Sequence, residues 1–127
     1  MKRIFTSALL LASLYCNAQY RLGVSKEDIK AECLSCSFKD TLANGRVLLY
    51  LNTPNGTIFY DFDDDGLSSS TKMYVDSYYA RQYMDDYNRQ YKIINETKWE
   101  QVLDKHVSVM VEYFPEGSYF YYKFKFN

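Results

Sequence analysis

The sequence predicts a two-layer α+β domain, in which two helices pack on one face of an antiparallel sheet of about five to six strands. Two segments, at about 26–36 and 71–90, have the apolar spacing of amphipathic helices. Several shorter segments have the alternation and composition of strands, and two tight-turn sequences connect neighbouring pairs of them. Helices mixed with hairpin-connected strands are typical of this fold class.

The chain begins with the pattern of a secretory signal peptide. A positively charged start precedes an apolar run over residues 4–15, and Ala18 offers a small residue for cleavage. The run is too short to span a bilayer, and no second one follows. We therefore expect residues 1–18 to be removed and residues 19–127 to form a single domain that is secreted or periplasmic, without an integral membrane segment.

The charge balance of the expected mature chain limits its partners. It contains 13 basic and 16 acidic residues, a net charge of −3. A chain of this charge is not expected to bind nucleic acid. The 14 Tyr and 8 Phe residues must supply much of the core, and some of these rings are expected to remain outside it.

The first helix is predicted by its start signal. Ser25 is the expected N-cap, Asp28 lies three residues later, and the pattern predicts a helix over about 26–36. Its apolar face would carry Ile29 together with Cys33 and Cys36.

A hairpin is predicted next. Strands over 47–51 and 57–62 are separated by a turn that contains Asn55-Gly56, the strongest short-range hairpin signal. The two strands should therefore be antiparallel neighbours.

The second and longer helix is predicted over about 71–90, after a serine run at 68–70 that offers N-caps. An apolar ridge with i+4 spacing supports it. The ridge consists of Val75, Tyr79, Tyr83, Tyr87 and Tyr91.

The remaining chain is predicted to form strands, the last two of them joined as a hairpin. Their expected ranges are 91–94, 98–103, 107–114 and 118–126.

The last strand also carries a candidate binding surface. Its even-numbered aromatic residues are expected to face the core, so the odd-numbered residues project from the opposite face. These are Tyr119, Tyr121, Lys123 and Lys125. Interleaved aromatic and basic side chains can bind a peptide or a glycan. The alternative is a solvated sheet face on which Tyr is simply a good strand former.

The N-terminal part resembles a known family. The segment from Gly23 to Ile29, a helix, and a hairpin ending in Tyr60-Asp61-Phe62-Asp63 together resemble the opening of small SmpA/OmlA-type envelope domains. The resemblance implies a non-enzymatic envelope protein that acts by binding partners. This chain departs from the family pattern because its second helix follows the hairpin, so the family's partners do not carry over.

An acidic turn gives a candidate calcium site. Asp61, Asp63 and Asp65 precede Gly66 with the spacing of the first half of a calcium loop. Position twelve, which should be a bidentate glutamate, is Lys72. The alternative is a strand that ends in an Asp-Gly turn, and we expect no tight metal binding.

Cys33 and Cys36 form a C-x-x-C pair that we expect to be a disulfide in an oxidising compartment. Redox enzymes place this motif at the N-terminus of a helix, whereas here it lies at the other end of the predicted helix. Zinc is not expected, because His106 is the only histidine and no second C-x-x-C exists.

No catalytic set is apparent. His106 lies in a predicted turn, with no Ser or Cys placed beside it as a nucleophile. The sequence therefore predicts a non-enzymatic binding protein without a cofactor, whose partner is a protein or a glycan. The alternatives are a small secreted enzyme such as a hydrolase, or a calcium-stabilised module.

Overall fold

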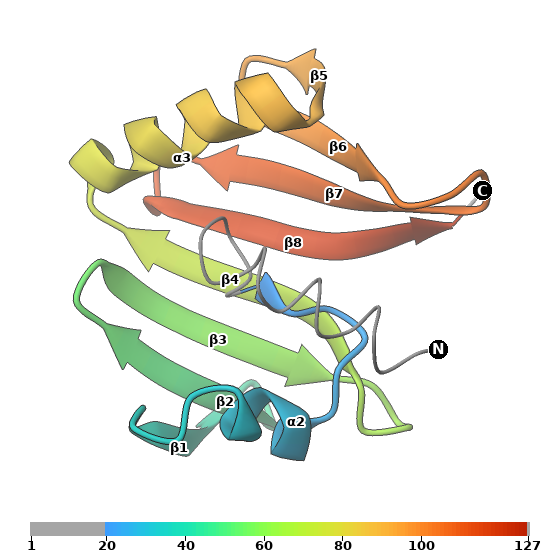
Figure 1. The fold of residues 1–127 in the computed structure, drawn as a ribbon. Helices are drawn as coiled ribbons and strands as arrows, with labels where there is room; N and C mark the ends of the chain where they lie inside the picture. Colours follow the sequence, from blue (N-terminus) through green and yellow to red (C-terminus); the bar gives the residue numbers. More distant parts are fainter. Residues whose placement is uncertain (1–19, 127) are drawn as a thin grey trace.

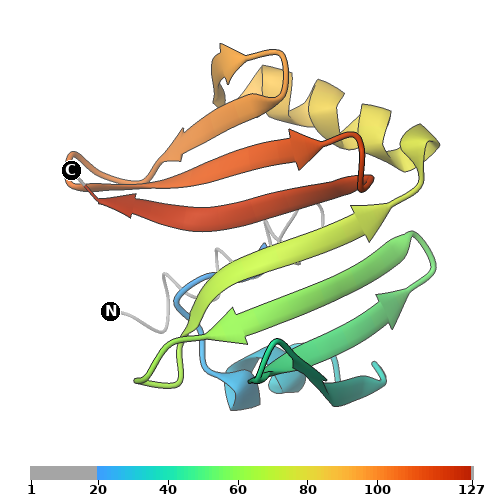
Figure 2. The ribbon, with the colours of Figure 1, turned by 180° about the vertical axis from the view of Figure 1, so that it is seen from behind.

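The computed structural model describes residues 20–126, and the predicted signal peptide lies outside them. Figures 1 and 2 show these residues as one curved antiparallel sheet with two helices. In chain order the elements are α2 (Lys26–Ala31), β1 (Phe38–Ala43), β2 (Arg46–Thr53), β3 (Gly56–Phe62), β4 (Ser68–Val75), α3 (Ser77–Gln90), β5 (Lys92–Asn95), β6 (Lys98–Val102), β7 (Val107–Phe114) and β8 (Tyr119–Phe126). The order of strands across the sheet is β1-β2-β3-β4-β8-β7-β6-β5.

The topology consists of two similar halves. In each half one helix is followed by four strands that pair with their sequence neighbours. The halves join where β4 pairs with β8 in antiparallel register, with Met73 opposite Phe120. All eight strands therefore belong to a single sheet.

The predicted fold class is wrong. The structure is mainly β: eight strands rather than five to six form one sheet, and the two helices are short, with 6 and 14 residues. Two strands account for the difference. No strand was predicted over the residues of β1, and the segment that forms β4 was predicted to begin the second helix.

The error at β4 has a physical cause. Val75 fits the i+4 ridge of the predicted helix, but it also alternates with Thr71 and Met73 on one face of a strand. All three side chains are buried, and pairing with β3 and β8 on both sides stabilises the extended form. The helix begins only after Asp76, whose backbone is extended (φ −64°, ψ 152°).

The first helix is also shorter than predicted. Ser25 is its N-cap as expected, and its hydroxyl accepts a hydrogen bond from the Asp28 N–H at 3.2 Å. The helix ends at Ala31, and Ile29 is its one buried residue. A helix of this length depends on tertiary contacts, and the burial of Ile29 supplies one of them.

Both predicted hairpins are confirmed. β2 and β3 are antiparallel neighbours connected through the Asn55-Gly56 turn, with Leu51 opposite Ile58. β7 and β8 form the second hairpin, with Val111 opposite Tyr122. The predicted strands after the second helix correspond to β5, β6, β7 and β8.

The core lies on one face of the sheet, which we call the core face. Its largest fully buried side chains are Trp99, Tyr60, Tyr87, Tyr122 and Phe120. Tyr87, from α3, makes edge-on contacts with Trp99 and Phe120 at ring-centroid distances of 5.6 and 5.5 Å. Helix α3 therefore closes the core over the second half of the sheet.

The segment that precedes α2 completes the core face (Figure 1, blue). Tyr20 stacks on Tyr122 with ring centroids 4.8 Å apart, and its hydroxyl donates to Gln101. Backbone bonds join the segment to β4, because Gly23 N–H donates to the Ser68 carbonyl and Ser68 N–H donates to the Val24 carbonyl. This segment begins only two residues after the expected cleavage position.

A pair of tyrosine hydroxyls lies within the core. The hydroxyls of Tyr87 and Tyr122 are hydrogen-bonded to each other. Burial raises the pKa of both well above the ordinary value. The pair is therefore neutral at physiological pH, and its mutual bond satisfies two polar groups that would otherwise be costly to bury.

Candidate binding surface

Among residues 20–126, no helix covers the face opposite the core. Side chains alternate along β8, so Tyr119, Tyr121 and Lys123 point away from the buried Phe120 and Tyr122. Figure 2 shows the sheet from this side, and none of the described residues forms a helix in front of the strands. We call this side the open face. All four residues predicted as a binding surface lie on it: Tyr119, Tyr121, Lys123 and Lys125.

Five aromatic rings cross the open face in contact with one another. Their centroid distances are 5.2 Å from Tyr50 to Phe59, 5.7 Å from Phe59 to Tyr74, 5.0 Å from Tyr74 to Tyr119 and 4.9 Å from Tyr119 to Phe114. The rings come from β2, β3, β4, β8 and β7, so at about 4.8 Å per strand they extend about 19 Å across the sheet. Each ring is half-buried. We call this set the aromatic row.

Strand register places these rings together. Tyr50 is directly opposite Phe59, and Tyr119 is directly opposite both Tyr74 and Phe114. Aromatic pairs facing each other across strands stabilise a sheet through ring contact. The row therefore contributes to stability as well as forming a surface, and its rings hold each other in place.

Basic side chains lie on one side of the row. The Lys72 Nζ atom lies 5.2 Å from the centre of the Tyr119 ring, a cation–π contact. Lys72 and Lys123 are exposed and make none of the ion pairs found among residues 20–126. They are therefore available to an incoming negative group.

One carboxylate of the open face is held in place by its neighbours. Glu100 accepts a hydrogen bond from the Ser108 hydroxyl at 2.6 Å, and Lys125 Nζ lies 4.0 Å from it. The Ser108 bond, with Lys125 nearby, lowers the pKa of Glu100. Glu100 is therefore ionised near neutral pH and partly offsets the charge of Lys125.

Two carboxylates of the acidic turn already have partners within the protein. Asp63 accepts from the backbone N–H groups of Asp65 and Leu67 at 2.9 and 3.0 Å, which closes the turn after β3. Asp61 is paired with Arg46 at 2.9 Å. No group of three or more His, Cys, Asp or Glu side chains within the described residues is arranged to hold a metal ion.

We predict that calcium does not stabilise this protein. At millimolar calcium the melting temperature should shift by less than about 1 °C, because a ligand that does not bind the folded state adds no stability. Differential scanning calorimetry with and without calcium measures this. A clear increase that disappears in Asp63→Asn would show that the turn is a metal site.

The two cysteines lie in the turn that follows α2, not on the helix as predicted. Their Cα atoms are 5.4 Å apart, at disulfide distance, and the Cys36 N–H donates to the Cys33 carbonyl at 3.1 Å. Leu34 and Ser35 between them are exposed. This position at the surface is suited to a structural crosslink.

We predict that the mature protein, unfolded without reductant, contains no titratable thiol. Reduction should change its stability little, because the closed loop is very short and constrains the unfolded chain weakly. Thiol titration in denaturant, followed by thermal melts with and without reductant, measures both quantities. Two free thiols in the untreated protein would contradict the disulfide.

The single histidine of the sequence lies in an exposed turn. His106 follows β6, and its backbone N–H donates to Asp104 Oδ1 at 2.7 Å. Asp104 also accepts from the Val107 N–H at 2.9 Å, so its carboxylate organises the turn. This arrangement is that of a solvated turn.

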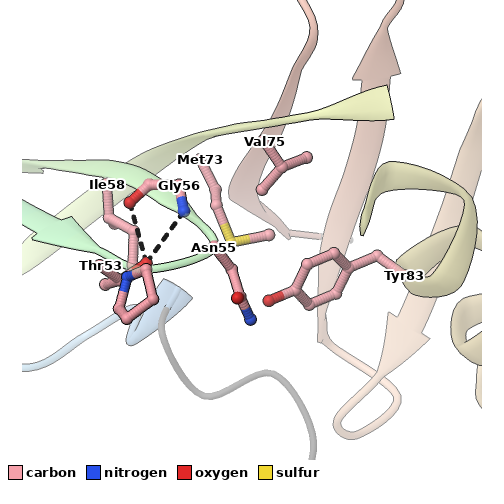
Figure 3. A pocket seen from close by; sticks show the side chains of 8 residues that line it. Thr53, Asn55, Gly56, Ile58, Met73, Val75 and Tyr83 are labelled. Carbon is pink, nitrogen blue, oxygen red and sulfur yellow. Dashed lines mark hydrogen bonds between the residues drawn. The ribbon is translucent and has the colours of Figure 1, made fainter. Parts of the chain in front are cut away.

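One small cavity lies between the β2–β3 turn and α3 (Figure 3). Its volume is about 180 Å³, and its polar lining includes Thr53, Asn55 and Tyr83. Thr53 is engaged by Gly56, whose N–H donates to its hydroxyl at 3.1 Å, and burial raises the pKa of Tyr83. The cavity is smaller than most sites for small molecules, which are roughly 300–1,000 Å³.

Comparison with protein-family models, curated proteins and solved structures finds no match to this chain. The resemblance of its opening segment to SmpA/OmlA-type domains therefore stays an expectation. Neither of the two helices within residues 20–126 is long and apolar enough to cross a bilayer.

Sequence reasoning identified only part of this surface. It placed Tyr119 and Tyr121 outside the core but did not connect them to Tyr50, Phe59 and Tyr74. The outward position of Phe59 follows from alternation with Ile58 and Tyr60. The contact of Tyr74 with Tyr119 could not be predicted, because it requires the pairing of β4 with β8.

Proposed function

We propose that this chain is a non-enzymatic protein that works outside the cytoplasm and binds a partner through its open face. The observation that carries the proposal is the aromatic row, whose five rings remain partly exposed on a face that no described helix covers. Contiguous apolar surface of this kind on a folded chain usually marks an interaction site. Tyr is moreover among the residues enriched at protein interfaces.

Two observations favour binding over hydrolysis. The single histidine lies in a solvated turn, and the cavity at Tyr83 contains no pair of acid and base groups. A hydrolase needs a base, a nucleophile and an orienting group within hydrogen-bond reach of one another. The open face, by contrast, offers an extended surface suited to contact with a large partner.

The location outside the cytoplasm is part of the same proposal. It rests on the signal-peptide pattern of residues 1–18, which lies outside the described residues. The Cys33–Cys36 pair at disulfide distance is compatible with an oxidising compartment.

We predict that replacing Tyr119 and Tyr121 together with Ser weakens partner binding by at least about tenfold, since truncating one buried aromatic anchor costs about 1–3 kcal/mol. The test is a pull-down from envelope extract of the source cells with immobilised residues 19–127. Tyr78→Ser is the matched control, because Tyr78 is an exposed tyrosine on α3, away from the open face.

A stoichiometric partner that binds the wild type and the control but not the double variant supports the proposal. Equal capture by all three proteins would place the binding site elsewhere. Hydrolytic turnover that is lost on replacing His106 or Asp63 would replace the proposal with the enzyme alternative.

A further inference from the structure

The charge of this protein is unevenly distributed between its two sides. Strand alternation assigns seven basic and three acidic side chains to the open face, a net charge of +4. The basic ones are Lys39, Arg46, Lys72, Lys92, Lys98, Lys123 and Lys125, and the acidic ones are Asp61, Glu100 and Glu112. The other six basic and thirteen acidic residues of the described chain carry −7. Residues 20–126, whose net charge is −3, thus present a basic aromatic surface on one side.

We propose that the open face binds an acidic segment of another protein, in which carboxylates alternate with apolar side chains. The inference deepens the proposed function and rests on it. Complementary charge steers association and fixes the register of a complex. Carboxylates would pair with Lys72 and Lys123, which lie on the same side of the Tyr74–Tyr119 pair, while apolar side chains pack on the aromatic row beside them.

The arrangement of the rings favours a protein over a glycan. A sugar stacks on a flat and accessible ring face, but the faces of Tyr119 are already occupied. Phe114 stacks on it with an interplanar angle of 22°, and the Lys72 ammonium lies over the ring. Phe59 meets its neighbours edge-on, at 64° to Tyr50 and 84° to Tyr74. These contacts use ring surface of Tyr119 and Phe59 that a stacked sugar would need, whereas apolar side chains of a protein can pack against rings at varied angles.

Charge also argues against a second copy of this chain as the partner. Two open faces brought together would oppose a net charge of +4 with another of the same sign. Like charges facing each other across an interface cost several kcal/mol. The acidic side chains outside the open face lie mainly in turns and on the helices.

The experiment selects binders to residues 19–127 from a displayed library of random 15-residue peptides. The affinity of each enriched peptide is then measured by titration. The variant Lys72→Glu with Lys123→Glu should weaken binding by at least tenfold. The control Lys30→Glu with Lys105→Glu makes the same change of charge away from the open face and should have little effect. Enriched sequences should be rich in Asp and Glu, and their affinity should fall by at least tenfold between 50 and 300 mM salt.

Four other outcomes overturn the inference in distinguishable ways. Neutral peptides that still require Tyr119 and Tyr121 would refute the acidic segment and leave the proposed function intact. Peptides whose binding changes neither in the Tyr119/Tyr121 double variant nor in the Lys72/Lys123 double variant would refute both proposals. Polygalacturonate, an acidic polysaccharide, is tested as a second probe. Binding to it without any peptide enrichment would assign the face to acidic glycans. No enrichment of any peptide and no binding to polygalacturonate would overturn the acidic segment.

Discussion

Replacing Phe120 with Ala is expected to lower the free energy of unfolding by about 3–5 kcal/mol, as truncation of a buried aromatic ring does. Its ring is fully buried and contacts Tyr113 at 4.7 Å and Tyr87 at 5.5 Å. The adjacent change Tyr121→Ala should cost less than about 1 kcal/mol, because that side chain is on the open face and outside the buried core.

Urea denaturation of the two variants measures this difference. Both sites lie on β8 and have aromatic side chains, so each variant controls for the strand propensity of the other. A large loss for Tyr121→Ala would mean that the open face is a second core. A small loss for Phe120→Ala would mean that the two faces are exchanged.

The second large effect is expected at Tyr20. Tyr20→Ala should cost about 2–4 kcal/mol, because it removes a ring stacked on Tyr122 and leaves a gap above the core. Tyr20→Phe keeps the stacked ring and loses the hydrogen bond to Gln101, so it should cost only about 1 kcal/mol.

Thermal melts of both variants, made as mature chains starting at residue 19, measure the two losses. If Tyr20→Ala has the same melting temperature as the wild type, the segment before α2 is not part of the core. If Tyr20→Phe is as damaging as Tyr20→Ala, the hydrogen bond rather than the stacking holds the segment.

Local signals explain which elements were predictable. The Asn55-Gly56 turn and the alternation of β3 identify one hairpin, and the alternating aromatic residues of β8 identify the outward side chains of that strand. The N-cap Ser25 is likewise a short-range signal. Each of these features is determined by residues within about ten positions of one another.

Long-range pairing explains the failures. The segment from Thr71 to Val75 fits the apolar spacing of a helix and that of a strand. Only pairing with β3 and β8, on the two sides of β4, selects the strand. β1 has the exposed Lys39, Asp40 and Leu42 among its six residues, so it lacks a strong strand pattern and forms by pairing with β2. The aromatic row depends on both halves of the sheet, and its position could not be predicted before the strand order was known.

Lysine footprinting of the complex tests the central claim most directly. The protein, bound to the partner obtained by pull-down, is acetylated briefly, and modification at each lysine is quantified by mass spectrometry. We predict that Lys72 and Lys123 on the open face are protected, while Lys30 on α2 and Lys105 in the β6–β7 turn react as in the free protein. Protection of Lys30 and Lys105, with Lys72 and Lys123 still reactive, would show that the partner binds elsewhere.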